Sequence, residues 1–354
     1  MFYLINFLFI YVYYAFISLL DKSKGPKKKY IFFIMVCLHA VLFRAFANPF
    51  NYVDTDLYAS GFDMIKIMSF NEAIFSINIY TTWGVCYVFI NWLIGQFCDN
   101  FQVLYAVISF LSVTPIIYFY YKTSYKFLFS ITFYLIYPML YIMGFGVLRQ
   151  HLSIAFIMLA ILNMDNYKRS IPLIFFSVLC HTSSLVIVPF FFMRKFNISK
   201  YNPIKLLGFV LLGVTVSRFI LISFVYNMRY YGDVAKGESE NNIVPTLLIG
   251  SLILVLYITG CLKKEMCNQD RYILNFLFYG FAIALFSMGQ AGGGRLSLAF
   301  IYVLPVGISF LFKYLKNHSI PIIYTLMVFI LIGILYFMSG FDYYKYSFFW
   351  EPTV

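Results

Sequence analysis

Long apolar runs alternate with short polar segments along the whole chain. Residues 31–43 and 322–338 are apolar on every face of a helix, so they lack the two-residue alternation of a half-buried strand. About 20 helical residues cross the hydrocarbon core of a bilayer. The pattern therefore predicts an all-α fold with many membrane-spanning helices. The twelve candidate runs lie near residues 2–20, 30–47, 82–97, 101–121, 127–146, 148–163, 171–193, 206–226, 244–262, 272–289, 296–312 and 321–339.

The charges between these runs predict how the chain is oriented. The loop at residues 21–29 contains five lysines, which favours the cytoplasmic side of the membrane. The segment 48–80 contains four carboxylates and one lysine, and the segment 227–243 is similarly poor in net positive charge. We therefore expect 48–80 and 227–243 to be outer loops.

The number of crossings stays open at this point. Twelve full crossings would leave Lys122, Lys126 and the Lys168-Arg169 pair outside. This conflict disappears if one segment within 79–121 and the segment 171–193 do not cross fully. The run 83–97 gives only about 22 Å of helix, and polar residues interrupt 171–193. We predict one integral membrane domain over residues 1–354, with 10 to 12 transmembrane or partly re-entrant helices.

Composition excludes a soluble protein of this size. The chain is 62% hydrophobic and 11% charged, with a mean hydropathy of +0.83. The net charge of +12 lies mainly in short loops, where it sets orientation, so we expect no nucleic-acid partner. The six cysteines show no zinc-binding spacing, and we interpret them as small core residues. No metal or cofactor is predicted.

Arginines are the candidate functional groups within the apolar runs. Arg44, Arg149, Arg218 and Arg295 lie in or at the edges of these runs, whereas all 14 carboxylates lie in loops or at segment ends. Charges at membrane depth are costly, and a planar guanidinium bonds phosphate through two hydrogen bonds. A lipid-linked phosphate or diphosphate would therefore suit them. The alternative is that Arg44 and Arg218 reach to the interface or pair with loop carboxylates.

Arg149 and His181 are predicted to lie in the outer half of the membrane. Counted from the basic turn around Tyr167, they lie roughly 27 Å and 21 Å along two adjacent antiparallel segments. Gln150 beside Arg149 and the hydroxyl residues after His181 favour a polar site there. The alternative for His181 is a hydrogen-bonded core histidine.

The predicted outer loops contain further candidates. Aromatic residues and carboxylates alternate around Asp54 and Tyr58, a composition that suits sugar binding. Asp54-Thr55-Asp56 matches the DxD pattern of metal-dependent glycosyltransferases, but their nucleotide-sugar donors are cytosolic, so metal binding is disfavoured. A solvated loop with a helix-capping aspartate is the plain alternative. Glycines before Arg295 permit a close approach of phosphate, and Arg229 is a further candidate for substrate binding.

Three short motifs in order resemble a known family. They are residues 146–155, which include Arg149-Gln150, then Lys168-Arg169, and then His181 followed by Thr182-Ser183-Ser184. Together with Arg44, Asp54 and Tyr58 upstream and Arg295 downstream, they resemble the EpsG-like group of O-antigen and exopolysaccharide polymerases, the Wzy type. The resemblance covers roughly residues 40–315. Thr82-Trp83-Gly84 departs from the pattern, because many members have a carboxylate there.

The resemblance implies a GT-C-like polymerase of the bacterial inner membrane, acting on the periplasmic side. It would transfer a growing glycan from undecaprenyl diphosphate to the non-reducing end of another lipid-linked repeat unit. We expect partnership with membrane lipids, a chain-length regulator and a flippase. Arg149 would stabilise the leaving diphosphate without a metal, and Asp54 or His181 would act as the base, an alternative left open. The substrate-binding candidates are Arg44, Tyr58, Gln150, Arg295 and Arg229.

Three other functions compete with the polymerase. A lipid-linked oligosaccharide flippase also needs cations for the diphosphate, but it typically has two related halves, and the chain shows no internal repeat. A membrane O-acyltransferase would need its histidine near a cytosolic acyl donor, whereas His181 is predicted to lie in the outer half of the membrane. A purely structural assembly subunit is the third alternative.

Overall fold

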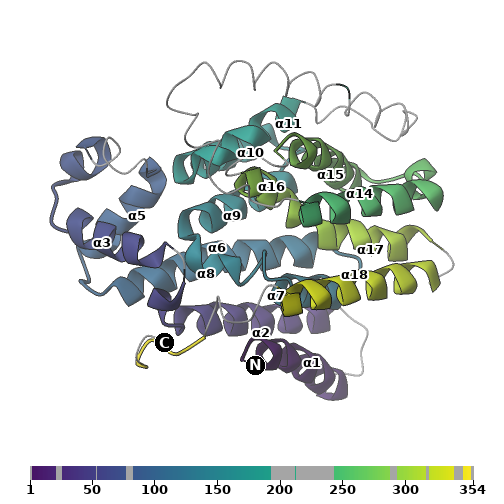
Figure 1. The fold of residues 1–354 in the computed structure, drawn as a ribbon, viewed down its shortest axis with the longest axis horizontal. Helices are drawn as coiled ribbons and strands as arrows, with labels where there is room; N and C mark the ends of the chain where they lie inside the picture. Colours follow the sequence, from purple (N-terminus) through teal and green to yellow (C-terminus); the bar gives the residue numbers. More distant parts are fainter. Residues whose placement is uncertain are drawn as a thin grey trace. The chain divides into compact units, whose positions relative to one another are not determined.

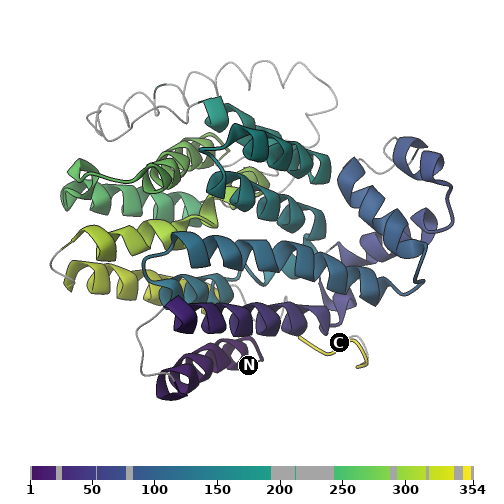
Figure 2. The ribbon, with the colours of Figure 1, turned by 180° about the vertical axis from the view of Figure 1, so that it is seen from behind.

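The computed structural model describes residues 2–20, 26–52, 54–76, 83–192, 212, 243–287, 293–315, 319–338 and 346–351. All regular structure in these ranges is helical, apart from one bridging pair between Ala47 and Phe348 (Figures 1 and 2). The helices are apolar along most of their length, as the uninterrupted hydrophobic runs require. These features confirm an all-α polytopic membrane protein.

Two helical stretches are long and apolar enough to cross a bilayer, judged by length and composition within the described ranges. They are Phe101–Thr123 and Leu296–Tyr314, and the second is interrupted by a turn between α16 (Gly293–Ile301) and α17 (Leu304–Tyr314). Shorter apolar helices make up much of the remainder. One of these is Val85–Gly95, which is shorter than the apolar run that contains it. The number of full crossings stays a prediction.

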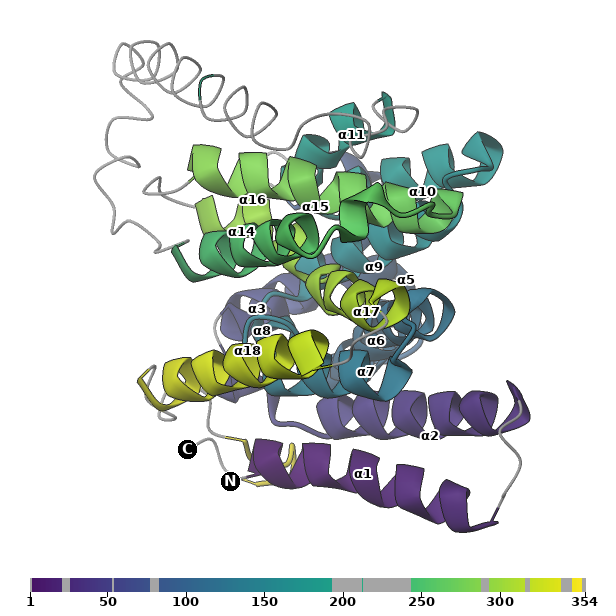
Figure 3. The same cartoon turned by 90° about the vertical axis from the view of Figure 1, so that its right-hand side faces the viewer.

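The helices form two compact units. The first contains the described residues up to 122, residues 127–185 and those after 330. Within it α1 lies antiparallel along α2 (Figure 3), and α9 packs along α10. Its elements are α1 (Phe2–Leu20), α2 (Pro26–Ala45), η1 (Pro49–Asn51), α3 (Thr55–Ile65), the π-helix η2 (Glu72–Ser76), α5 (Val85–Gly95), α6 (Phe101–Thr123), α7 (Phe127–Ile136), α8 (Met143–Gly146), α9 (Leu148–Leu162), α10 (Tyr167–Cys180) and η3 (Thr182–Ile187), which ends in the second unit.

The second unit packs aromatic side chains between α15 and α16. The rings of Phe276 and Phe300 lie 4.6 Å apart, and Gly280 lets the two helices approach closely. At the start of α15 the buried Asp270 accepts a hydrogen bond from Lys313 at 2.5 Å and another from Tyr314. The elements are α11 (Val188–Phe192), α14 (Ile243–Ile258), η6 (Cys261–Lys263), α15 (Asn268–Ser287), α16 (Gly293–Ile301), α17 (Leu304–Tyr314) and most of α18 (Ser319–Met338).

The predicted antiparallel pairing of the Arg149 and His181 segments is confirmed as the α9–α10 hairpin. Ser153 on α9 lies 2.8 Å from the Ser177 hydroxyl and also donates to the Ser177 carbonyl at 2.9 Å. Its hydroxyl contacts Ser184 as well. The interruption predicted within 171–193 is confirmed too, because α10 ends at Cys180 and a 3-10 helix follows His181.

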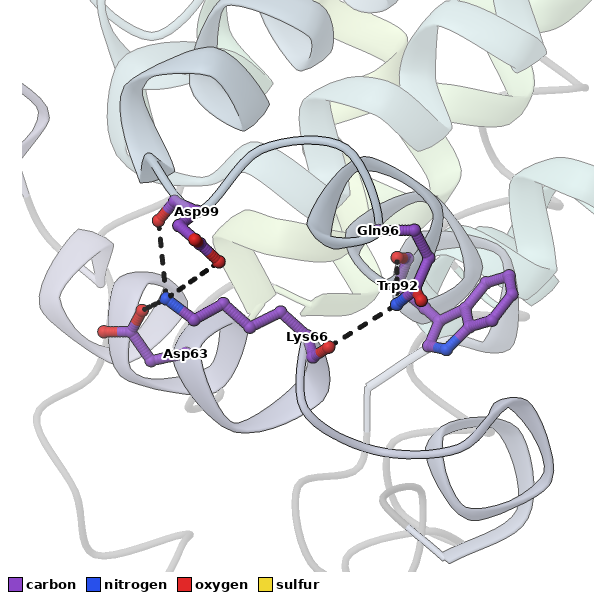
Figure 4. A network of polar contacts seen from close by, with 5 residues as sticks. All are labelled: Asp63, Lys66, Trp92, Gln96 and Asp99. Carbon is purple, nitrogen blue, oxygen red and sulfur yellow. Dashed lines mark hydrogen bonds and ion pairs between the residues drawn. The ribbon is translucent and has the colours of Figure 1, made fainter.

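Within the segment 48–80 predicted as the first outer loop, the described residues 48–52 and 54–76 are mainly helical. Helix α3 buries Tyr58 and Phe62, and its end is held against the α5–α6 connection by Lys66 (Figure 4). Lys66 Nζ donates to Asp63 at 2.8 Å, and its carbonyl accepts from Gln96 at 3.4 Å. The hydrogen bond with Asp63 raises the pKa of Lys66. On which side of the membrane this segment lies stays a prediction.

Residues 346–351 form the partner of the α2–α3 connection. The amide of Asn48 donates to the Ser347 carbonyl at 2.8 Å, and its side-chain amide donates to the Glu351 carbonyl at 3.0 Å. The rings of Phe43 and Tyr346 stack at 4.3 Å. This segment therefore fixes the backbone from which α3 begins.

Gly280→Ala should lower the melting temperature of the purified protein in detergent. The added Cβ would lie 2.4 Å from Cβ and Cγ of Phe300, the least movable part of that side chain. Such overpacking costs about 1–3 kcal/mol, more than the ~1 kcal/mol that alanine gains over glycine in a helix. Gly250→Ala is the matched control, because its Cβ would meet only the tip of the Phe281 ring. Equal melting temperatures would contradict the tight α15–α16 contact.

Candidate functional site

The guanidinium of Arg149 lies over two neighbouring aromatic rings. Arg149 lies in the first turn of α9, and its Cζ is 5.6 Å from the ring centroids of both Tyr58 and Trp83. Tyr58, Trp83 and Tyr87 contact one another with centroid separations of 5.6 Å. Contacts between a guanidinium and an aromatic ring contribute about 0.5–2 kcal/mol, more as they are removed from water. The two rings therefore restrain a half-buried cation.

Two glycines allow these rings to reach Arg149. A Cβ on Gly61 of α3 would lie 2.0 Å from the Trp83 ring, so the indole occupies the space that a side chain would need. A Cβ on Gly84 would lie 2.1 Å and 2.7 Å from the carbonyl oxygens of Leu179 and Cys180. Gly84 thus brings the start of α5 against the end of α10. Trp83 was not predicted as a site residue, and the glycine that follows it is the signal that could have identified it.

Asp54 has a strained backbone at the start of α3. Its φ of 68° and ψ of −7° make it the one non-glycine residue with positive φ among the described residues. Its side chain makes no capping hydrogen bond, although the residue occupies the N-cap position. The Asp54 carbonyl accepts from the Tyr58 amide at 3.1 Å, so the half-buried aspartate is one turn from a ring that contacts Arg149. Strain of this kind is concentrated at functional sites.

His181 is bound by the turn that follows it. The amide of Ser183 donates to His181 Nδ1 at 3.2 Å, and the Ser183 hydroxyl lies 2.7 Å from the same nitrogen. Because an amide can only donate, Nδ1 must be the acceptor and the ring proton must be on Nε2. In this arrangement Nδ1 is occupied as an acceptor.

Arg44 is completely buried at the end of α2. Its Nη1 lies 2.7 Å from His151 Nδ1 and 3.1 Å from Ser112 Oγ, and its Cζ is 5.8 Å from the rings of Tyr105 and Phe145. It forms no ion pair with a carboxylate of the described chain. His151 was not predicted as a site residue. The signal that could have identified it is a polar residue in an apolar run, two positions after Arg149.

For the remaining predicted site residues, the structure describes only part of their surroundings. Gln150 is buried next to Arg149 on α9. Arg295 lies in α16, but its side chain is outside the described residues, and Arg229 is outside them altogether. The structure thus brings together Arg149, Tyr58 and the backbone of Asp54.

The electrostatics of the first unit favour an anionic ligand. Arg149 lies in the first turn of α9, and Arg44 contacts His151 of the same helix. Two guanidinium groups in an environment of low dielectric constant produce a strong positive potential near the start of α9. Among the described residues no cluster of three histidine, cysteine or carboxylate side chains is arranged to hold a metal ion. Arg149 is the more accessible of the two cations.

Comparison with known proteins gives one match. The model of the EpsG family matches residues 34–351, which is nearly the whole chain. No curated protein and no solved structure shows a significant match.

Gly61→Ala should displace Trp83 from the ring cluster. We expect a red-shifted Trp83 emission, measured in a protein in which Trp92 and Trp350 are replaced by phenylalanine, because the new Cβ would occupy the position of the indole. Ser60→Ala, an exposed position on the same helix, is the control and should leave the spectrum unchanged. An unshifted spectrum for Gly61→Ala would show that Trp83 does not fit against α3 as described.

Proposed function

The chain belongs to the EpsG family of polysaccharide polymerase-type membrane proteins, and from this premise we propose that it joins lipid-linked oligosaccharides on the periplasmic side of the bacterial inner membrane. An acceptor hydroxyl would attack the anomeric carbon of a glycan carried on undecaprenyl diphosphate. The bond between that carbon and the diphosphate oxygen breaks, and the diphosphate leaves with the bonding electrons. The hydroxyl proton passes to a base, so the product is a longer glycan on the acceptor lipid.

The guanidinium of Arg149, restrained by two aromatic rings, is the observation that carries this proposal. Negative charge grows on the diphosphate as the glycosidic bond breaks, and a fixed donor aimed at that charge stabilises the transition state more than the ground state. Tyr58 and Trp83 restrain the guanidinium, whose planar fork can bond two phosphate oxygens. The reaction as written requires no metal.

Asp54 is the better candidate for the base. A carboxylate that makes no hydrogen bond with the described chain is free to accept a proton from the sugar hydroxyl. His181 already uses Nδ1 as an acceptor for Ser183, which makes it the weaker candidate for the base. The strained backbone of Asp54 is consistent with a carboxylate held for this purpose.

Substrate binding would extend beyond these residues. We assign Gln150, Arg295 and Arg229 to donor or acceptor contacts, as their sequence positions predicted. Membrane lipids surround the enzyme, and a flippase and a chain-length regulator would supply repeat units and limit the polymer.

Arg149→Ala should abolish polymer while preserving the first repeat unit on its acceptor. Removing one fixed donor to a developing oxyanion lowers rates by about 10²–10³-fold. The measurement is the surface-glycan ladder of a deletion strain complemented with the wild-type gene, Arg149→Ala or the control Arg169→Ala. Arg169 is an exposed arginine at the start of α10, so its variant should restore the ladder.

The same experiment separates the competing functions. A deletion strain with a single repeat unit on its acceptor supports polymerisation. Loss of even that unit, with lipid-linked units accumulating inside the cell, would indicate a flippase. An intact ladder would indicate modification, such as acylation, or a structural role. Normal long chains from well-expressed Arg149→Ala protein would contradict the role of Arg149.

Asp54→Asn should lower polymerisation about 10²–10⁴-fold, the usual contribution of a general base. Asparagine tolerates a left-handed backbone, so the start of α3 is retained while the base is lost. His181→Asn keeps an acceptor for Ser183, and we expect it to cost about tenfold or less if the imidazole is only a donor. Asp56→Asn, an exposed carboxylate in the first turn of α3, is the control. The reverse order of effects would make His181 the base.

A further inference from the structure

We infer that Arg44 acts on the site through His151, as the positioning residue that fixes the first turn of α9 and therefore Arg149. The inference rests on the proposed function, and it assigns Arg44 a role different from substrate binding. A side chain with no exposed surface cannot reach a lipid-linked diphosphate while its present contacts hold. The guanidinium is enclosed by Ser112, His151 and the rings of Tyr105 and Phe145.

Arg44 determines the protonation of His151. A guanidinium has donors and no acceptor, so His151 Nδ1, 2.7 Å from Nη1, must accept and the ring proton must be on Nε2. The Nε2 atom faces the Tyr134 hydroxyl at 3.4 Å. The charge of Arg44 further disfavours a protonated imidazole beside it. His151 is thus held as one neutral tautomer.

The position of the His151 ring is fixed from the other side by α8. A Cβ on Gly144 would lie 2.8–2.9 Å from three atoms of the ring, so the ring packs directly on the glycine backbone. Together the Arg44 bond and the Gly144 contact leave the ring no alternative place. His151 is completely buried in this position.

His151 in turn fixes the start of α9. The chain turns at Val147, where φ is −92° and ψ is 63°, so the preceding helix does not dictate the direction of α9. Successive helical residues are about 100° apart, so Arg149 and His151 point to nearly opposite sides of α9. One side of this turn is therefore held by Arg44, and the other side presents Arg149 to Tyr58 and Trp83.

The test separates the hydrogen bond from the charge. His151→Leu removes the acceptor but keeps both arginines, whereas Arg44→Gln removes the charge and weakens the donor. His151→Asn and Arg44→Lys keep an acceptor and a charged donor, respectively. Gly144→Ala displaces the His151 ring without removing a polar group. It replaces His151→Leu or Arg44→Gln in the test if either of these two variants fails to fold.

Two readouts are needed for each variant in the full-length protein. The first is the surface-glycan ladder in the deletion strain. The second is the emission maximum of Trp83 as the only tryptophan, because the indole contacts Arg149 and its emission responds to displacement of that charge. The emission of Arg149→Ala defines the full shift.

We expect His151→Leu and Arg44→Gln to reduce polymer about tenfold or more, because displacements of about 1 Å at a reacting centre cost up to 10²-fold. Both should also move the Trp83 emission at least half of the way to that of Arg149→Ala. The conservative variants, His151→Asn and Arg44→Lys, should retain polymer within about threefold of wild type.

Two outcomes would overturn the inference. The first is wild-type emission and polymer in His151→Leu together with loss of polymer in Arg44→Gln, which would show that Arg44 acts through its charge or by contacting substrate. The second is wild-type Trp83 emission in both His151→Leu and Arg44→Gln, whatever amount of polymer these variants produce. Failure of the polymerase proposal is distinguishable from failure of this inference. In that case Arg149→Ala would give normal chains, while the shifts in Trp83 emission would still show that Arg44 and His151 position Arg149.

Discussion

The removal of two guanidinium groups from water is the constraint on which the first unit depends. An ion transferred into a protein interior loses several kcal/mol of hydration even after relaxation. Arg149 is compensated in part by Tyr58 and Trp83, and Arg44 in part by His151, Ser112 and two further rings, while Nε and Nη2 of Arg44 make no hydrogen bond with the described chain. Helices α2, α3, α5, α6 and α9 contribute these groups or lead directly into them. Their packing therefore follows largely from where the two cations are placed.

The two cations are treated differently. Arg44 has lost all contact with solvent, which suits a residue that holds other residues. Arg149 is half-buried and lies over two rings, which suits a residue that receives an anion. In the proposed reaction Arg149 would bind the diphosphate, while Arg44 would hold the turn of α9 that carries Arg149.

The sequence was sufficient to predict the helical class, the α9–α10 pairing and its interruption at His181, because hydrophobic runs and polar breaks record these features directly. Both Arg149 and Tyr58 were also predicted from the sequence as site residues. It was insufficient for Trp83, Gly61 and His151, whose places depend on contacts between helices far apart in the chain. The helix α3 was missed within a predicted loop, because its apolar face covers only a few turns between carboxylates. Tertiary packing decided each of these.

The bridge between Ala47 and Phe348 has a consequence for how the protein is assembled. Asn48 finds its partners 303 positions later, at Glu351, and close by at Ser347. During synthesis, every intervening helix is made before the connection that leads into α3 and Asp54 can be completed. The segment nearest the start of the site is therefore among the last to acquire its final structure.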